Sequence, residues 1–400
     1  MNVLMLSLMY PRDTLEEVSR NAKDKLQIQI DSYQRAFAEG IRENLGRGEA
    51  LDIINALPVG VFPKQYSKAL LPARWHDGHT LYELGCINLP GLKQCGRALR
   101  AAQRIAAWCA KSAQNRTVLI YTVYLPYLQA VMRVKKRYPD LKACVIVTDL
   151  PNEFGLASGR SGLLKRIEYA RGCKSMALCR RMDGFVLLTR PMAEALGIGD
   201  KPYLVIEGLI LNSKEVKPTA GQQGRPAVLY SGTLEPDLGV GEMLEAFSQM
   251  PEYELWICGQ GSMRRDVESA ARRAPNIRYY GFVPHKQALA LQSRADLLIN
   301  PRSPRGTFTR YSFPSKTLEY LRSAKPVVCY RLEGIPQEYD PYLYFIEGDG
   351  PEAIMRAVRK ALSLPPEERQ ALGERARAFI LANKTPAVQC RRLMSYLRGL

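Results

Sequence analysis

Short runs of apolar residues recur along the chain, separated by segments of helix length. This alternation is typical of parallel sheets covered by helices on both faces. In the first half, the runs lie at residues 3–8, 118–121, 144–148, 185–189 and 204–206. In the second half, they lie at residues 227–230, 254–258, 277–280, 296–299, 326–330 and 343–346. We therefore predict buried parallel strands in both halves and an α/β fold class.

The two sets of predicted strands are separated by residues 213–226, which are rich in Lys, Pro, Gly and Gln. Such a composition indicates a linker between domains. We expect two doubly wound, Rossmann-like domains, residues 1–212 and 227–383, facing a central cleft at the carboxyl ends of their strands. A last helix, 384–400, follows a break near 383–386 and is free to return to the first domain.

Composition narrows the class of protein. The chain has 400 residues, of which 46% are hydrophobic and 8% aromatic, and this excludes a disordered chain. No uncharged apolar run reaches the roughly 18 residues of a spanning helix, so we expect neither a membrane span nor a signal peptide. The 9 cysteines are odd in number and form no CxxC pair, which favours reduced thiols in the cytoplasm.

The net charge of +18 is concentrated in one region. Residues 91–182 hold 18 Lys and Arg against four acids, and the segment 160–181 mixes basic with apolar residues. If helical, this segment has an apolar side with a basic collar, which would suit an anionic membrane surface. A core helix with a solvated basic back is an equal alternative. The residues predicted to face the membrane are Lys165, Arg166, Arg171, Lys174, Arg180 and Arg181.

A nucleic acid is a third candidate partner for so basic a chain. The sequence contains no zinc finger, RNP motif or KH loop, and its longest basic run is residues 135–137. We therefore expect no nucleic-acid partner.

Two glycine-containing turns in the second half follow predicted strands. Gly232 and Thr233 follow the strand at 227–230, and Gly259 and Gly261 follow the strand at 254–258. Exposed backbone N–H groups in such turns, together with the positive end of the next helix, suit a phosphate group. Either turn by itself is more often an ordinary loop.

The segment 300–317 contains four cations and no acid, and it leads into a predicted helix. The cations are Arg302, Arg305, Arg310 and Lys316. Ser315 and Lys316 mark the helix start, where free amides favour an anion. Glu319 lies one turn further on the same face, and its two oxygens could accept both hydroxyls of a ribose. The plainer alternative is a solvated Glu beside a basic loop.

Polar residues also end a strand in the first half. Thr148 and Asp149 follow the predicted strand at 144–148, where Asp149 either contacts a substrate or caps the next turn. His76 and His79 lie in the sequence WHDGH, and no third ligand is near them in the sequence. We therefore predict no metal site.

Four segments, in this order, resemble a known family. They read YSGTLEPDLGV, LWICGQG, RYYGFVPHKQALALQSRADLLINPR and YSFPSKTLEYLRSAKPVV. They are similar to the donor half of the group 1 retaining glycosyltransferases of the GT-B fold, over about residues 226–335. The sequence from NPR to SKTLEYL resembles the matching segment of bacterial enzymes that build exopolysaccharide and capsule repeat units. The first half resembles the same group more loosely.

The resemblance implies roles for single residues. Glu319 would hold the donor ribose, and Ser315 and Lys316 would lie at the diphosphate. Gly232 and Thr233 would lie by the phosphates, Gly259 would line the nucleotide pocket, and the backbone near Val283 would meet the base. Asp149 would act on the acceptor side of the cleft. We expect Asp149, Lys316 and Arg302 to serve catalysis, and Arg310 to assist donor binding.

The chain departs from the family pattern at several positions. The first Glu of the E-x7-E element falls at Tyr311, and the usual His before Asp149 falls at Thr148. The usual phosphate-binding Arg and Lys fall at Thr233 and Leu238. Arg302, Arg310 and Lys316 could replace the missing cations. Without such replacement, the protein would be a non-catalytic relative.

The resemblance implies an enzyme that transfers a sugar from a nucleotide diphosphate sugar, with a UDP-sugar favoured, and retains the anomeric configuration. It implies no metal and no further cofactor. The expected acceptor is a lipid-linked glycan in polysaccharide synthesis, so we expect a cytoplasmic protein bound peripherally to the anionic inner face of the membrane. The alternatives are a non-catalytic nucleotide-sugar-binding or assembly subunit and a basic nucleic-acid-binding protein.

Overall fold

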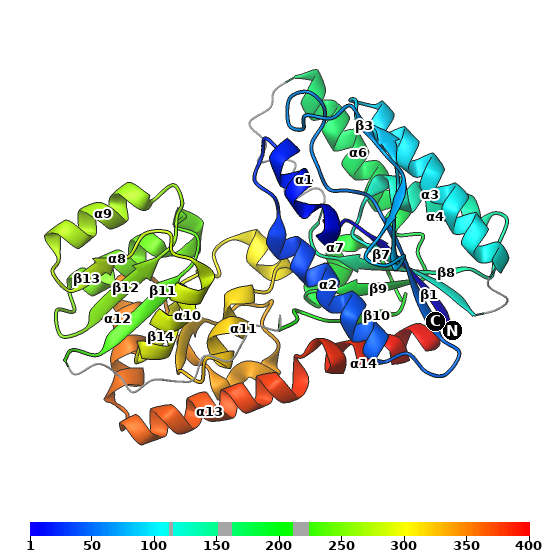
Figure 1. Ribbon diagram of the computed structural model, residues 1–400. Helices are drawn as coiled ribbons and strands as arrows, with labels where there is room; N and C mark the ends of the chain where they lie inside the picture. Colours follow the sequence, from blue (N-terminus) through cyan, green and yellow to red (C-terminus); the bar gives the residue numbers. More distant parts are fainter. Residues whose placement is uncertain (112–114, 151–161, 211–223) are drawn as a thin grey trace. The chain divides into compact units, whose positions relative to one another are not determined.

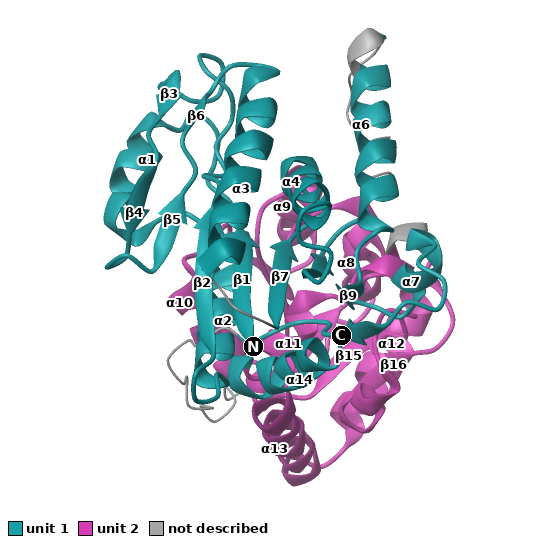
Figure 2. Ribbon diagram, turned by 90° about the vertical axis from the view of Figure 1, so that its right-hand side faces the viewer, with its two compact units in different colours: residues 1–211, 386–400 teal, residues 212–385 magenta. Residues whose placement is uncertain are grey.

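The computed structural model describes residues 1–111, 115–150, 162–210 and 224–400. The chain forms two compact units (Figure 2). Unit 1 contains residues 1–211 and 386–400, and unit 2 contains residues 212–385. Most of the predicted linker, 213–226, lies outside the described residues.

Unit 1 is built on a sheet of eight strands in the order β10-β9-β8-β7-β1-β2-β5-β4. All neighbouring strands are parallel except β4 and β5. The bounds are β1 Asn2–Ser7, β2 Ala50–Asn55, β4 Arg74–His76, β5 Leu81–Glu83, β7 Arg116–Tyr121, β8 Lys142–Val147, β9 Gly184–Leu187 and β10 Tyr203–Val205. Two short antiparallel strands, β3 Leu70–Leu71 and β6 Cys86–Ile87, form a separate ribbon.

Helices cover both faces of this sheet (Figure 1). Val3 and Met5 of β1 share a core with Phe37 of α2 and Leu393 of α14, so these two helices lie on one face. Helices α3 and α4 pack together on the other face. The helices of unit 1 are α1 Leu15–Asn21, α2 Ile28–Glu43, α3 Leu92–Lys111, α4 Leu125–Lys135, α6 Leu163–Cys179, α7 Pro191–Leu196 and α14 Pro386–Arg398, with the 3-10 turn η1 Arg12–Thr14.

The C-terminal helix α14 is part of unit 1. Cys390, Leu393, Met394 and Leu397 are buried in its core. The Tyr396 hydroxyl accepts a hydrogen bond from the Phe185 amide at 3.0 Å and donates one to the Pro202 carbonyl at 2.7 Å. The helix thereby satisfies backbone groups beside strands β9 and β10.

Unit 2 is a fully parallel sheet of six strands in the order β13-β12-β11-β14-β15-β16. Its strands are β11 Ala227–Ser231, β12 Glu254–Cys258, β13 Ile277–Tyr279, β14 Leu297–Asn300, β15 Val327–Tyr330 and β16 Tyr344–Ile346. Its helices are α8 Val240–Ser248, α9 Arg264–Arg273, α10 His285–Arg294, α11 Ser315–Arg322, α12 Gly350–Ser363 and α13 Pro366–Asn383.

The predicted α/β class with parallel strands is confirmed, and each predicted strand is present within a few residues of its expected bounds. The prediction omitted β2 to β6. Strand β2 has no continuous apolar run because Asp52 and Asn55 interrupt it, and β3 to β6 are only two or three residues long. Such strands carry too little pattern to be found from periodicity.

Candidate functional site

The carboxyl ends of the central strands of unit 2 form a connected set of loops. The Gly232 amide, after β11, donates to the Cys258 carbonyl at 3.0 Å, and the Gly259 amide, after β12, donates to the Gly281 carbonyl at 2.9 Å. The Tyr279 hydroxyl donates to the Gly259 carbonyl at 2.8 Å. The turns that the sequence placed after separate strands thus lie side by side at the edge where parallel sheets bind ligands.

Gly259 is required by this close approach. Its φ is +148°, and a Cβ atom placed on it would lie 1.8 Å from the Gly232 carbonyl oxygen. No side chain fits there, so the two backbones pack directly against each other. Thr233 remains exposed beside them.

The turn before α8 meets the loop after β14 at Gly239. A Cβ atom on Gly239 would lie 1.9 Å from the Pro301 carbonyl oxygen, and its φ is +75°. Arg302 is the next residue of this loop, and Leu238, the position where the resemblance places a Lys, is the residue before Gly239. Arg302 is 8% exposed and hydrogen-bonds to the Ser312 hydroxyl. Burial lowers the pKa of Arg302 to about 10, so its guanidinium stays charged at neutral pH.

Helix α11 begins where the sequence predicted. Pro314 is the extended N-cap residue, and Ser315 is exposed at the first turn. Glu319, one turn further, lies within reach of two partners. The Lys316 ammonium is 3.1 and 3.2 Å from its two oxygens, and the Gln292 amide of α10 donates to its Oε1 at 2.5 Å. Glu319 and Lys316, to which the resemblance gives the ribose and the diphosphate, are therefore in contact at the start of α11.

The interpretation of segment 300–317 as cations without acids needs correction. The acids come from other elements of the fold. Arg310 forms two hydrogen bonds with Glu333, at 2.7 and 3.0 Å, and Arg305 lies 3.3 Å from Glu242 and 3.5 Å from Asp349. The sequence window could not show these partners, since they lie 23 to 63 residues away. Arg310 is exposed and paired with Glu333, whereas Arg302 is buried in the loop after β14.

The predicted base-contacting segment follows β13. Phe282 is 72% exposed, and Val283 is partly exposed beside it. Phe282 and Leu381, at 72% and 40%, are exposed large hydrophobic side chains of unit 2. An exposed aromatic ring at the carboxyl edge of the sheet can stack on a nucleobase.

In unit 1, Asp149 lies at the carboxyl end of β8. The Thr148 hydroxyl donates to Asp149 Oδ2 at 3.2 Å and lies 3.1 Å from the hydroxyl of Thr122, which follows β7. The Asp149 side chain keeps contact with solvent, but the surrounding protein desolvates it and raises its pKa. The residues after Leu150 lie outside the described residues until Gly162.

A buried charged array, which sequence reasoning missed, lies at the same sheet edge. Asp13 accepts from His76 Nδ1 at 2.8 Å, and His76 Nε2 lies 3.3 Å from Glu83 Oε2. His76 and Glu83 have side chains only 1% exposed, whereas Asp13 is 49% exposed. Neither Glu83 oxygen has a hydrogen-bond partner in the described structure, and burial raises the pKa of Glu83.

This array is not arranged for a metal. His76 Nδ1 is bonded to Asp13 and His76 Nε2 accepts a hydrogen bond from Arg74 Nε at 3.2 Å, and no cluster of such side chains in the described ranges is placed to hold a metal ion. The only sequence signal for the array was the WHDGH segment. Asp13 lies 63 residues before His76, so spacing could not link them.

Helix α6 does not have the single apolar face that its sequence predicted. Met176 and Cys179 are buried in the body of unit 1, but Ile167 is 40% and Tyr169 64% exposed. All six predicted membrane-facing basic residues are exposed. The first turns of α6 therefore present basic, aliphatic and aromatic side chains to solvent together.

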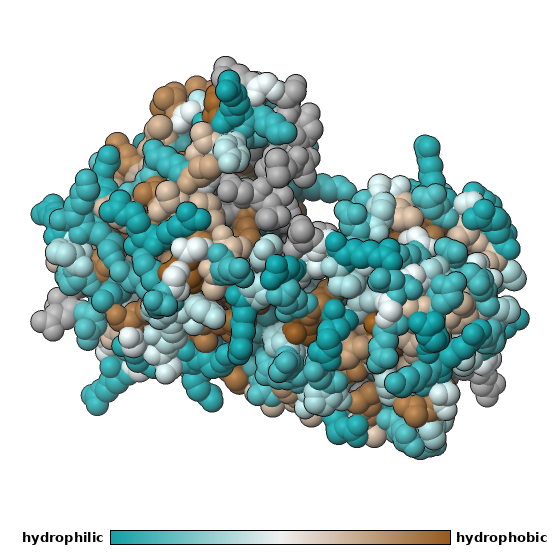
Figure 3. Space-filling model, turned by 180° about the vertical axis from the view of Figure 1, so that it is seen from behind, coloured by the Kyte–Doolittle hydropathy of each residue, from teal (hydrophilic) through white to brown (hydrophobic). Residues whose placement is uncertain are grey.

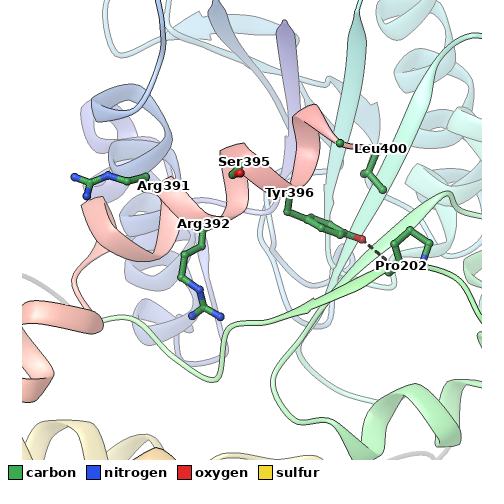
Figure 4. Close-up of a pocket in the computed structure, with 7 residues that line it drawn as sticks. Pro202, Arg391, Arg392, Ser395, Tyr396 and Leu400 are labelled. Atoms are coloured by element: carbon green, nitrogen blue, oxygen red, sulfur yellow. Dashed lines mark hydrogen bonds between the residues drawn. The ribbon is translucent and has the colours of Figure 1, made fainter.

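A surface hollow in unit 1 lies elsewhere. Pro202, Arg392, Ser395, Tyr396 and Leu400 line it, together with Arg391 and Gly399. Figure 4 shows Tyr396 bonded to Pro202 and the Arg391 side chain directed away from them. Pro202 precedes β10, so the hollow lies at the amino end of that strand, opposite to the edge where ligands bind. We do not assign a substrate to it.

Comparison with known proteins finds a family match over most of unit 2. Residues 212–379 match the family model of glycosyl transferases group 1. A Bacillus subtilis (strain 168) protein, provisionally named teichuronic acid biosynthesis glycosyltransferase TuaH, is 29% identical over 224 residues. This match covers 51% of the chain and 55% of the relative, so it spans about half the length of that protein.

Several solved structures share the architecture of the whole chain. Sucrose-phosphate synthase from Thermosynechococcus elongatus has a TM-score of 0.62 at 15% identity, covering 100% of both chains. The α,α-trehalose 6-phosphate synthase from Burkholderia multivorans has a TM-score of 0.60 at 13% identity, covering 100% of this chain and 96% of that one. The lipopolysaccharide outer core galactosyltransferase WaaB has a TM-score of 0.62 at 11% identity, covering 100% and 99%. At such identities, the likeness concerns the fold. Residues 212–379 thus match the glycosyl transferases group 1 family model, and the chain as a whole has the GT-B fold.

Proposed function

We propose that the protein is a retaining glycosyltransferase that uses a nucleotide diphosphate sugar, with a UDP-sugar favoured. The observation that carries the proposal is the position of Glu319 and Lys316 at the start of α11, in a domain of the group 1 family. Glu319 would bind the ribose hydroxyls, and Phe282 and Val283 would contact the base. Gly232, Thr233 and Gly259 would lie along the phosphates, with Ser315 at the start of α11.

The chemical requirement is to stabilise the diphosphate leaving group as its negative charge develops. Fixed cations and helix-start amides can do this without rearrangement. Lys316 and Arg302 are the cations we assign to this task, and Arg302 takes the part of the Lys missing at Leu238. In a retaining reaction of this kind, the departing phosphate oxygen can itself take the proton of the acceptor hydroxyl. Asp149 then orients a sugar and is not needed as the general base.

Ligand-induced thermal stabilisation tests donor binding. A nucleotide sugar present at 100 times its Kd stabilises the folded protein by about 2.7 kcal/mol. We expect one of the UDP-, GDP- or dTDP-sugars to raise the Tm, Glu319→Ala to abolish the rise, and Asp149→Asn to preserve it. No rise with any donor would refute the proposal. Binding without transfer to any glycan acceptor and without donor hydrolysis would favour the non-catalytic alternative.

The role of Arg302 has its own test. Arg302→Met should weaken binding of the donor nucleotide diphosphate, and adding Leu238→Lys to this variant should restore part of the affinity. Arg305→Met is a matched control, because Arg305 is exposed and paired with Glu242. Equal losses in the Arg302 and Arg305 variants, or no recovery with Leu238→Lys, would remove Arg302 from the phosphate site.

We further propose that unit 1 rests on an anionic membrane surface, where a lipid-linked glycan acceptor would be found on the cytoplasmic side. No helix in the described part of the chain is long and apolar enough to cross a bilayer. Of the large hydrophobic side chains that are exposed among the described residues, 11 belong to unit 1 and two to unit 2. On the face in Figure 3, hydrophobic residues reach the surface in small groups among hydrophilic ones.

Sedimentation with vesicles tests the membrane proposal. Protein should pellet with anionic vesicles and much less with neutral ones, because each Lys or Arg near the headgroups contributes about 1 kcal/mol. Charge reversal of Lys165, Arg166 and Arg171 should abolish binding. Reversal of three exposed arginines of α9, at positions 265, 272 and 273, should not. Equal binding to both vesicle types would contradict the proposal, and steep salt-dependent binding to DNA or RNA would favour the nucleic-acid alternative.

A further inference from the structure

Gln292 is a buried polar residue whose hydrogen-bonding groups are only partly satisfied. Its side chain is 0% exposed on α10. Its Nε2 donates to Glu319 Oε1 at 2.5 Å, while its own Oε1 has no hydrogen-bond partner in the described ranges of the chain. A buried amide that lacks a partner destabilises a fold, and an apolar residue of this size would pack there without that cost. The hydrogen bond to Glu319 is therefore the contact that favours a glutamine over an apolar residue at this position.

Lys316 contacts the same carboxylate in a different way. It lies on α11 one turn before Glu319, and its ammonium touches both oxygens, at 3.1 and 3.2 Å. The Lys316 side chain is 35% exposed, whereas Gln292 is buried in the core. Lys316 is thus bonded to the two Glu319 oxygens that ribose hydroxyls would have to approach.

We propose that Gln292 is a positioning residue that holds Glu319 in place, while Lys316 leaves Glu319 for the donor diphosphate when the nucleotide binds. This inference rests on the proposed function. The diphosphate attracts Lys316 with two negative charges in place of one, and the departure of Lys316 frees both oxygens of Glu319 for the ribose. Gln292 keeps the carboxylate at the same point during the exchange. Binding of the phosphates thereby makes both oxygens of Glu319 available to the ribose.

The first experiment removes the fixed contact. Gln292→Met keeps the length of the side chain and removes the amide. The Kd for UDP should rise about tenfold, as expected for loss of a hydrogen bond to a charged group. The Kd for 2′,3′-dideoxy-UDP should stay within about twofold, because that ligand lacks the hydroxyls that Glu319 would bind. The Tm should not fall, since the variant removes an unsatisfied buried polar group. Gln287→Met, on the exposed face of the same helix, is the control.

The second experiment removes the exchangeable contact. Lys316→Met should weaken binding of UDP and strengthen binding of uridine, because uridine cannot displace the lysine but would benefit from its absence. Isothermal titration calorimetry measures both affinities. A variant that weakens both ligands would refute the exchange.

The outcomes distinguish failure of the proposed function from failure of the inference about Gln292 and Lys316. If the wild-type protein binds none of UDP, GDP and dTDP, the proposed function fails and the inference with it. If the wild-type protein binds UDP, but Gln292→Met weakens UDP and its dideoxy analogue equally or weakens neither, the inference alone fails.

Discussion

The hydroxyl of Tyr320 offers a direct test of how α11 supports the donor loops. It accepts a hydrogen bond from the Ser231 amide at 2.8 Å and lies 3.2 Å from the Ser231 carbonyl oxygen, to which it donates. Ser231 ends β11, beyond the residues that pair with β14, so no neighbouring strand supplies a partner on that side. Tyr320→Phe removes one oxygen atom and leaves the buried Ser231 amide without an acceptor.

The cost follows from burial. Tyr320 is 1% exposed and Ser231 5%, so water does not replace the lost hydroxyl. Leaving a buried donor unsatisfied costs about 1 to 3 kcal/mol of unfolding free energy. For a domain of about 150 to 250 residues, each kcal/mol lowers the Tm by about 2 to 4 °C. Ser231 leads directly into Gly232, so the affinity for the donor nucleotide should fall as well.

Urea unfolding, monitored by tryptophan fluorescence, measures the loss of unfolding free energy in unit 2. Trp256 is the one tryptophan of unit 2 and is buried, whereas Trp75 and Trp108 belong to unit 1 and can be replaced by Phe. Tyr253→Phe is the control, because Tyr253 is partly exposed and its hydroxyl has no partner in the described structure. A change below about 0.5 kcal/mol in the Tyr320 variant, equal to that of a typical surface substitution, would refute the assigned role.

Three further changes have definite expected outcomes. Gly259→Ala forces a Cβ atom into the Gly232 carbonyl and should abolish nucleotide binding, while Gly281→Ala, with positive φ but open space, should cost only about 1 kcal/mol in urea unfolding. Burial raises the pKa of Glu83 in the folded protein. The stability that this shift contributes is fully present below the unfolded pKa of about 4.3, and it is lost as the pH rises through the folded pKa. Glu83→Gln cannot ionise, so its Tm relative to wild type should increase between pH 4 and pH 8, and a constant difference would contradict this. Leu393→Ala should destabilise unit 1 by about 2 to 5 kcal/mol in urea, since the side chain is fully buried.

The strands of unit 2 and five strands of unit 1 could be predicted because a parallel strand buried on both faces is usually a continuous apolar run, whereas β2 to β6 lack such a run. The glycine turns, Lys316 and Glu319 could be predicted because they lie within a few residues of a strand end or a helix start. The partners of those residues could not. Gln292 lies 27 residues before Glu319, and Glu333 lies 23 residues after Arg310. Contacts of this kind follow from how helices pack on the sheet, which a local pattern of residue types does not encode.

The contribution of α14 to the core of unit 1 has a consequence for biosynthesis. The strands and α2 of unit 1 leave the ribosome first, but the residues that complete their core, 386–400, are made only after all of unit 2. Throughout that interval, the apolar surface around Phe37 and Val186 has no covering helix. Nascent unit 1 therefore presents a binding surface for chaperones during translation, and a ribosome that stalls within unit 2 would leave an aggregation-prone chain.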